Sequence, residues 1–292
     1  MYRGLQAGTT ANATSLAAAV RTAQNPSMNV EFTQLTDLGK VREGNEDYFG
    51  YVLAATAERA SSHGWLFALA DGVGGHELGE IASHTAVESM LAGFREAAAG
   101  ESHLALLTRL VQTANARVVD AGHVAGAGGT SMATTLVACA LRYDRVTVAH
   151  VGDSRCYLIR RGEANLLTRD HTVASEQVRL GLLSRDEAAE SENRHLLSRS
   201  LGSELFVKPE VNEHQVFPGD VLVLCSDGLH GSVSGSEMAA LTSHGGDLAA
   251  AAQRLVDIAN QRDGSDNISL QLIRVRSVER VGMYRGRPYR LP

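Results

Sequence analysis

The sequence is short of cysteine and proline, and each shortage excludes a class of protein. Among 292 residues there are three cysteines and five prolines, against 29 glycines. Three cysteines cannot supply a disulfide framework, and each lies in an apolar run, which indicates reduced, buried thiols and a cytoplasmic location. Few prolines and many glycines favour tight turns over flexible linkers, so we expect one compact unit.

Long apolar runs and an excess of positive charge are also missing. No run approaches the roughly 18 apolar residues that a membrane span needs. The net charge of −6 argues against a general nucleic-acid binder. From Arg274 onward, however, the sequence contains six arginines and only one acidic residue, Glu279. This end is either solvated or contacts an acidic partner or an anionic membrane surface. We therefore predict a monomer with no membrane span and no nucleic-acid partner.

What the sequence does contain is a set of four aspartates at the ends of expected strands. Short runs rich in Val, Leu and Ile, bounded by Gly and Asp, predict buried strands. An Asp beside such an end projects its carboxylate into a cleft, and several converging carboxylates require a cation. The four are Asp71 after 65–70, Asp153 after 146–152, Asp227 after 221–226, and Asp266 before 268–275. Oxygen ligands alone suit Mg²⁺ or Mn²⁺.

Other metal and nucleotide chemistries lack support. The sequence has no His-Glu-x-x-His motif and no close pair of cysteines or histidines, so a zinc site is not predicted. It also has no glycine-rich loop that ends in Lys-Ser or Lys-Thr, which disfavours P-loop nucleotide chemistry.

The order of expected elements indicates an α+β layered fold. Strands come in consecutive hairpins and helices come in pairs, which is typical of antiparallel sheets covered by helices. We predict hairpins from 131–140 with 145–151, from 155–160 with 164–167, and from 210–216 with 221–225, besides strands at 30–35, 48–54, 65–70 and 266–275. Apolar residues at helical spacing predict helices at 76–95, 104–119, 234–241 and 247–260.

Eight sequence blocks together resemble the metal-dependent serine/threonine protein phosphatases of type 2C, the PPM family, in their bacterial form. Each block is weak alone, but the eight occur in the family's order over about 30–275. They are TDLGKVREGNEDYFG (36–50), ADGVGGHELGEIAS (70–83), GGTSMATTLVAC (128–139), VGDSRCYLIR (151–160), LTRDHT (167–172), LSRSLG (197–202), LCSDGLHGSVS (224–234) and GSDNIS (264–269).

This resemblance implies a fold, a domain division and an activity. The fold is a four-layer α-β-β-α sandwich of two antiparallel sheets flanked by helices. Residues 1–28 would form a flexible extension, 29–276 the catalytic domain and 277–292 a basic tail. The activity is hydrolysis of phosphoserine and phosphothreonine on proteins by a metal-activated water, which reverses a Ser/Thr kinase. Phosphorylated proteins, including such a kinase and its substrates, are the expected partners.

The resemblance also assigns a pair of Mn²⁺ or Mg²⁺ ions to five residues. Asp71 would bridge the two ions. Gly72 would offer its carbonyl to one of them, with Glu46 nearby directly or through water. Asp227 and Asp266 would hold the other.

Further roles follow from the same motifs. Arg42 would grip the substrate phosphate, Asp47 would orient the attacking water, and Asp153 would help to hold a third ion. Val73 stands where many eukaryotic members have a histidine that protonates the leaving alcohol, so His76 or a metal-bound water would take that task. The charged segment 172–196 matches the family's mobile flap.

Plainer interpretations of these residues stay open. The aspartates could be turn formers, and Arg42 could simply pair with Glu46 or Asp47. The whole protein could be a catalytically inactive sensor, although every carboxylate ligand is present. It could be a metal-dependent phosphodiesterase or nuclease, although its catalytic region is acidic. Within the phosphatases, it could be a regulator of an anti-sigma-factor antagonist, although the sensory domain usual in such proteins is missing.

Overall fold

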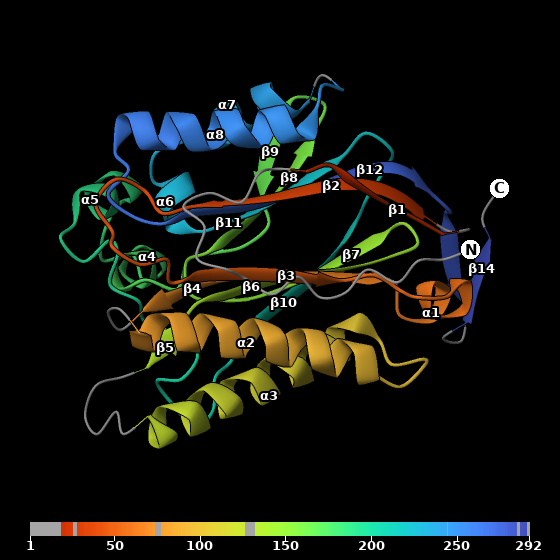
Figure 1. Cartoon of the computed structure of the whole chain (residues 1–292), viewed down its shortest axis with the longest axis horizontal. Helices are drawn as coiled ribbons and strands as arrows, with labels where there is room; N and C mark the ends of the chain where they lie inside the picture. Colours follow the sequence, from red (N-terminus) through yellow and green to blue (C-terminus); the bar gives the residue numbers. More distant parts are fainter. Residues whose placement is uncertain are drawn as a thin grey trace.

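The computed structural model describes residues 19–25, 28–73, 77–125, 132–243, 245–284 and 287–290. Two antiparallel sheets lie face to face, and helices cover the outer side of each (Figure 1). The predicted four-layer α-β-β-α sandwich is therefore confirmed. Within the described ranges, no helix has both the length and the apolar character that crossing a membrane requires.

The first sheet has the strand order β1-β2-β12-β11-β8-β9. Its strands are β1 (Arg21–Asn25), β2 (Met28–Asp37), β12 (Ile268–Val278), β11 (Val221–Cys225), β8 (Arg155–Arg160) and β9 (Glu163–Leu166). The helices α7 (Gly235–Thr242) and α8 (Leu248–Arg262) cover its outer face (Figure 1). A capping box between Ser234 and Glu237 starts α7, because each side chain binds the other residue's backbone N–H.

The second sheet has the strand order β10-β7-β6-β4-β3, with β5 paired to β4. Its strands are β10 (Glu210–Gln215), β7 (Arg145–Val151), β6 (Leu136–Arg142), β4 (Trp65–Val73), β3 (Asp47–Val52) and β5 (Ala133–Thr134). The long helices α2 (Glu77–Glu96) and α3 (His103–Val124) cover it. Shorter elements are α1 (Ala57–Ser62), α4 (Val173–Arg179), α5 (Arg185–Glu190), α6 (Asp227–His230), β13 (Val281–Tyr284) and β14 (Arg287–Arg290).

The continuous apolar run of β4 is explained by burial on both of its faces. Successive side chains of a strand point to opposite sides of the sheet. Leu66, Ala68 and Ala70 pack under α2 and α3. Trp65 and Phe67 pack between the two sheets, where Phe67 meets Phe32 of β2 edge to face at 5.0 Å between ring centroids. The strand therefore packs against the helical layer with one face and against the core between the sheets with the other.

One predicted hairpin is wrong. Residues 210–216 and 221–225 were expected to pair, but β10 pairs with β7 in the second sheet and β11 lies between β12 and β8 in the first. The link between them crosses from one sheet to the other. The buried Asp220 holds this crossing, since its carboxylate accepts from the Phe217 N–H at 2.8 Å and binds both Nε and Nη2 of Arg160.

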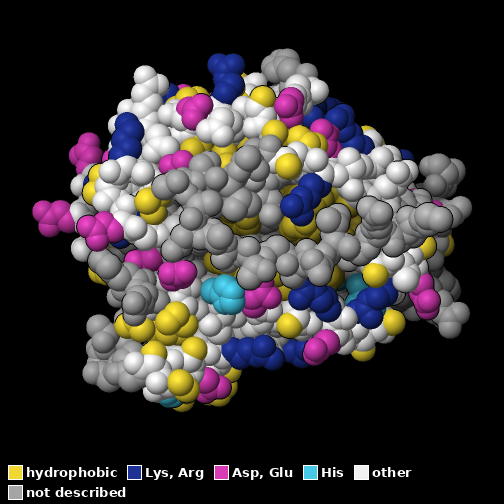
Figure 2. Space-filling model, in the orientation of Figure 1, with side chains coloured by type: hydrophobic (Ala, Val, Ile, Leu, Met, Phe, Trp, Pro, Cys, Tyr) yellow, Lys and Arg dark blue, Asp and Glu magenta, His cyan; other side chains and the backbone are white. Residues whose placement is uncertain are grey.

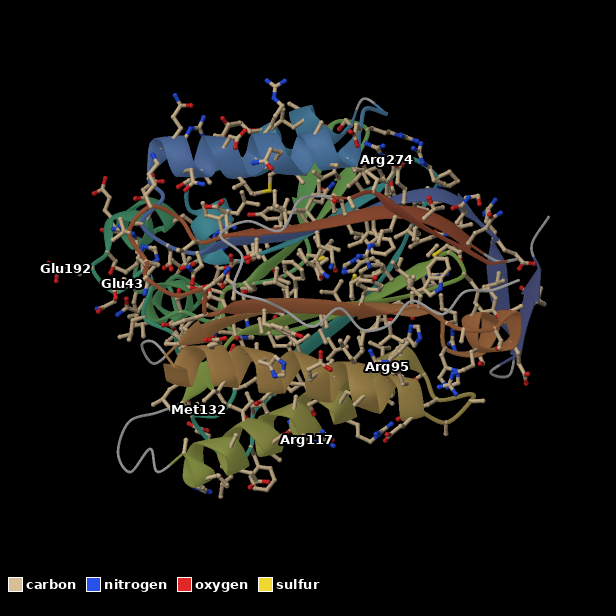
Figure 3. The ribbon with its side chains drawn as sticks, viewed as in Figure 1. Glu43, Arg95, Arg117, Met132, Glu192 and Arg274 are labelled. Atoms are coloured by element: carbon tan, nitrogen blue, oxygen red, sulfur yellow. The ribbon has the colours of Figure 1, made fainter. Side chains whose placement is uncertain are left out.

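Both predicted terminal segments contain regular structure. Residues 21–25, within the extension expected over 1–28, form β1 and pair with β2; residues 1–18 lie outside the described ranges. Residues 281–284 and 287–290 of the expected tail form a two-stranded sheet. Arg274, which Figure 3 labels, is buried, and its guanidinium donates to the carbonyls of Gly246 and Thr242. It therefore acts as a structural residue in the first sheet.

Candidate active site

Strand ends from both sheets meet at one end of the sandwich and bring the predicted aspartates together. Asp47 starts β3 and stands opposite Asp71 of β4 in the antiparallel register. Asp153 lies two residues after the end of β7, and Asp227, the first residue of α6, lies two residues after the end of β11. The carboxylate of Asp71 is close enough to feel the charges of the other carboxylates that line the site, namely Asp47, Asp153, Asp227 and Asp266. The sequence spacing alone could not establish this convergence.

Burial makes these carboxylates hard to ionise. Desolvation, and then the charges of neighbouring acids, raises the pKa of Asp47 to about 8, although hydrogen bonds from serines oppose the shift. The same causes raise the pKa of Asp71 well above its usual range, and that of Asp153 to about 7. Burial and the charge of Asp266 also raise the pKa of Asp227. Carboxylates whose ionisation is unfavourable in the metal-free protein are stabilised strongly by a bound cation.

The donor set fits hard divalent cations. Asp227 has a buried Oδ1 atom with no hydrogen-bond partner in the described part of the chain. A buried, unpartnered carboxylate oxygen among other carboxylates is costly unless a cation binds it. A groove of about 1180 Å³, whose walls include Asp153, Asp227 and Asp266, opens the cluster to solvent. Acidic side chains also gather on the surface at this end of the molecule, where α5 lies (Figure 2).

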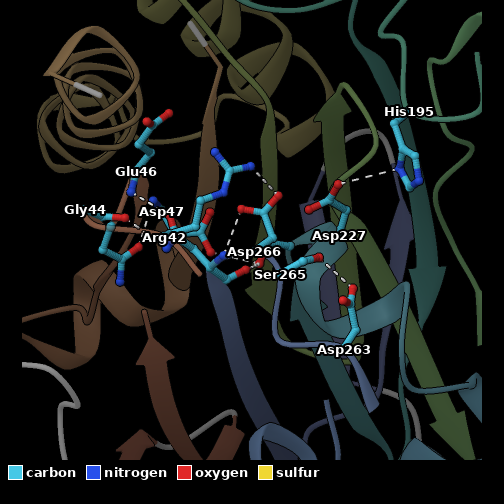
Figure 4. Close-up of polar contacts among 12 residues, drawn as sticks. Arg42, Gly44, Glu46, Asp47, His195, Asp227, Asp263, Ser265 and Asp266 are labelled. Carbon is cyan, nitrogen blue, oxygen red and sulfur yellow. Dashed lines mark hydrogen bonds and ion pairs between the residues drawn. The ribbon is translucent and has the colours of Figure 1, made fainter. Parts of the chain in front are cut away.

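Arg42 reaches the cluster from the loop between β2 and β3. Its Nη2 atom donates to Oδ2 of Asp266 at 2.7 Å, and Asp266 lies between Arg42 and Asp227 (Figure 4). The arginine side chain is 47% exposed. The plainer interpretation expected Arg42 to pair with Glu46 or Asp47. In the structure Arg42 instead forms an ion pair with Asp266, a predicted metal ligand.

Glu46 and Gly72 are held together by close backbone packing. The Gly72 N–H donates to the Glu46 carbonyl at 3.1 Å. A Cβ at Gly72 would overlap the carbonyl of Gly79 in α2, and a Cβ at Gly79 would overlap the Glu46 carboxylate. Because neither glycine has a side chain, α2 can approach the end of β4 and leave room for that carboxylate beside the cluster.

Sequence reasoning missed Asn267, which holds the loop that carries Arg42 and Glu46. Its buried side chain donates from Nδ2 to the carbonyls of Leu38 and Gly44, both at 3.0 Å. Its Oδ1 atom accepts from the Glu46 N–H at 2.8 Å. The only sequence signal was an amide directly after Asp266 in the last matching block.

Asn267→Ala is expected to destabilise the protein by about 2–4 kcal/mol, because three backbone groups of the loop lose the hydrogen bonds that this buried side chain makes. The loop also loosens, so metal-dependent activity falls together with the melting temperature. Calorimetry and phosphatase assays on the same preparation measure both effects. Asn165→Ala, at an exposed position on β9, is the matched control and should change stability by less than about 0.5 kcal/mol. An unchanged melting temperature for Asn267→Ala would contradict the role given to this side chain.

Ser226 and His195 were also missed. The Ser226 hydroxyl donates to Oδ2 of Asp47 at 2.9 Å and accepts from the Ser269 N–H at 3.0 Å. His195 Nδ1 lies 4.0 Å from Oδ2 of Asp227 at the edge of the groove (Figure 4). His195 is therefore a further candidate for the proton donor. The predicted candidate His76 lies outside the described residues.

Comparison with known proteins agrees with this geometry. The profile of the protein phosphatase 2C family matches residues 43–272. The serine/threonine phosphatase stp of Listeria innocua is 32% identical over 263 residues, which cover 89% of this chain and 99% of that protein.

Solved structures agree as well. The serine/threonine phosphatase of S. agalactiae has a TM-score of 0.76 and 32% identity, over 86% of this chain and 100% of that one. The catalytic domain of the serine/threonine phosphatase PstP, in complex with two manganese ions, has a TM-score of 0.70 and 31% identity, over 85% of this chain and 99% of that one.

The fold and the buried carboxylate cluster define a metal-dependent phosphatase. The chain belongs to the protein phosphatase 2C family. It is a protein-serine/threonine phosphatase, as its relatives are.

Proposed function

We propose that the carboxylate cluster holds two Mn²⁺ or Mg²⁺ ions during the removal of phosphate from phosphoserine and phosphothreonine. Asp71, Glu46, Asp227, Asp266 and the Gly72 carbonyl would hold these ions. One observation carries the proposal, namely that the half-buried Asp71 carboxylate lies among four other acidic side chains. Oxygen ligands in this number suit hard cations and disfavour zinc.

A third ion binds beside Asp153. Burial and the charges of Asp227 and Asp170 raise the pKa of Asp153, so this carboxyl also gains from positive charge. Asp153 lies on the wall of the open groove. We therefore expect this ion to exchange with solvent more readily than the other two.

Arg42 binds the phosphoryl group of the substrate. Its guanidinium is half-exposed at the cluster and contacts Asp266. With Asp266 engaged as a metal ligand, the guanidinium would be able to donate to two phosphate oxygens at once. Lysine is a poor substitute for this task because it offers a point charge in place of a planar fork.

Asp47 orients the attacking water. The Ser226 hydroxyl donates to one of its carboxylate oxygens and so fixes the position of the carboxylate. When bound, the divalent cations supply the positive charge that lowers the pKa of the attacking water and offsets the charge of the phosphoryl group. The carboxylates alone would repel a phosphate dianion, which makes activity dependent on the metal.

The partners follow from this chemistry. We propose that the substrates are phosphorylated proteins, including a Ser/Thr kinase and its targets, and that the enzyme acts as a monomer in the cytoplasm. The free, buried state of Cys139, Cys156 and Cys225 supports a reducing compartment. We further propose that 29–276 forms the catalytic domain.

Arg42→Lys tests the proposed phosphate contact. We expect kcat/KM for a phosphothreonine peptide with Mn²⁺ to fall by about 10- to 100-fold, since one charge-assisted hydrogen bond is lost. Arg254→Lys, at an exposed site on α8, is the control and should retain full activity. Parallel assays with Mg²⁺ and with chelator identify the metal. If chelated enzyme is fully active, or if a phosphodiester is cleaved faster than the peptide, the proposed chemistry is wrong.

A further inference from the structure

A separate basic cavity lies beside the groove that leads to the carboxylate cluster, next to α4. It has a volume of about 300 Å³ and is lined by Arg169, Glu176, Arg179, Ser198 and Arg199. Arg169 and Arg179 also line the groove that leads to the carboxylate cluster. Because the two spaces share these walls, a peptide that lies in the groove passes the mouth of the cavity.

The cavity is held rigidly to the active site. The Ser198 N–H donates to the His171 carbonyl, and the His171 N–H donates to the Gly152 carbonyl, both at 2.9 Å. Gly152 directly precedes Asp153. A group bound in the cavity is therefore at a fixed position relative to the carboxylates.

The arginines keep donor atoms available for a ligand. Arg179 uses Nε to pair with Glu176 at 2.6 Å, and its two Nη atoms have no partner in the described ranges. Arg199 donates from Nη1 to the Lys208 carbonyl at 2.9 Å, and none of the described carboxylates pairs with it. Arg169 pairs through Nη2 with Glu210. The Ser198 hydroxyl adds another donor to the lining.

Positive charge exceeds negative charge in this space. The Glu176 carboxylate has a pKa lowered by its hydrogen bond from Arg179 and by the charges of Arg179, Arg169 and Arg199. The three guanidiniums therefore lie around a single lining carboxylate. Guanidinium groups that converge in this way match the several oxygens of a phosphate better than they match one carboxylate.

A cation site next to the lining arginines is disfavoured. His150, His171 and Glu210 offer ligand atoms within 4.8 Å of one another, which is a spacing that could hold a metal. However, Glu210 is already paired with Arg169, and Nη1 of Arg199 lies 3.2 Å from Nε2 of His171. Two guanidiniums at the same atoms repel a divalent cation, so the charge of this region favours an anion.

We propose that the cavity lined by Arg169, Arg179 and Arg199 binds a phosphate-class dianion, and that a second phosphoryl group on the same substrate chain supplies it. The inference rests on the hydrolysis of phosphoproteins at the carboxylate cluster. One phosphoryl group enters that cluster while the other is held by the arginines. The enzyme then prefers segments phosphorylated at two nearby residues over segments phosphorylated at one.

A set of peptides tests the preference. One peptide carries a single phosphothreonine, and the others add a phosphoserine about two to eight residues away on either side, a range that an extended chain can span across the groove. The readout is the ratio of kcat/KM for the doubly phosphorylated peptide to kcat/KM for the singly phosphorylated one. At the best spacing we expect a ratio of about ten, which is the value of one charge-assisted contact.

Two variants and a control locate the effect. Arg179→Gln and Arg199→Gln are expected to bring the ratio close to one, while Arg254→Gln, which removes the same charge from α8, keeps the wild-type ratio. Arg179 is half-exposed and pairs only within its own helix, so its replacement leaves the fold intact. Since the ratio compares two substrates of one enzyme, a general loss of activity does not change it.

A second experiment shows whether the cavity binds a phosphoryl group of the substrate or free phosphate. Inorganic phosphate is added to chelator-treated enzyme, and the melting temperature is compared with that in chloride at equal ionic strength. If the ratio of the two kcat/KM values is near one, but phosphate raises the melting temperature and Arg179→Gln removes that rise, the cavity is an anion site whose ligand is free phosphate. A ratio near one without that rise overturns the proposal. Failure to hydrolyse any peptide contradicts the phosphatase activity itself and leaves a different signature.

Discussion

Asp71→Asn is expected to abolish Mn²⁺-dependent hydrolysis and, at the same time, to stabilise the metal-free protein. Desolvation, and then the like charges of the neighbouring carboxylates, raises the pKa of Asp71. A neutral amide removes that repulsion but is a much weaker ligand for the proposed cations. We expect a loss of at least about 1000-fold in kcat/KM, since a central electrostatic contact to the reacting group is lost. In chelator the melting temperature should rise by about 2–4 °C for each kcal/mol of repulsion relieved.

The opposite signs of these two effects make the test specific. Asp120→Asn, an exposed change on α3, is the matched control and should alter neither activity nor stability. A structural aspartate in a turn would behave differently, because its loss lowers the melting temperature. An active Asp71→Asn variant, or one that melts earlier than wild type in chelator, would refute the assignment of this residue.

The metal-free enzyme is expected to lose stability as pH rises from about 4 to about 8. The folded protein holds protons on Asp47, with a pKa of about 8, and on Asp153, with a pKa of about 7, whereas the ordinary aspartate value is 3.8. Burial is the first cause of both shifts. Stability from these protonated carboxyls is complete below the unfolded pKa and is lost as pH passes through the folded one. We expect the melting temperature in chelator to fall by about 5–10 °C.

Divalent cations should reverse this trend. Metal binding displaces the protons, so the stabilisation by Mn²⁺ grows with pH over the same window. Fluorescence of Trp65, the one tryptophan, reports unfolding because it is buried between the sheets. In chelator, Asp47→Asn should make the melting temperature depend less on pH, because the carboxyl with the higher of the two pKa values no longer titrates. A melting temperature that rises with pH between about 5 and about 8 in chelator would contradict the buried, protonated cluster.

Local sequence signals predicted much of the fold. The apolar spacing of α2 and α3 and the run that becomes β4 depend on residues near one another in the chain. The capping residues that start α7 are equally local. Pairing between distant strands is different, and 210–216 with 221–225 shows why. The two segments are close in sequence with a turn between them, yet β10 pairs with β7, because long-range packing outweighs the local preference.

The candidate site divides in the same way. The motifs and the family resemblance predicted Asp71, Asp227 and Asp266 as metal ligands and Arg42 as the phosphate contact, and these roles remain predictions. The sequence did not indicate that Arg42 contacts Asp266, or that Asn267 holds the loop between them. Both contacts join residues more than 200 positions apart. No local pattern encodes them, because they form only when the two ends of the catalytic region meet in one sheet.

By itself the sequence determined the family, the layered architecture and the acidic chemistry, because motif composition and apolar periodicity are properties of short segments. The tertiary structure alone decided which carboxylates share a buried space, and so which pKa values rise, since desolvation and repulsion depend on distances between remote residues. It also decided that Arg169, Arg179 and Arg199, from three separate positions in the chain, line one cavity. Packing brings those guanidiniums together, and nothing in their sequence spacing requires it.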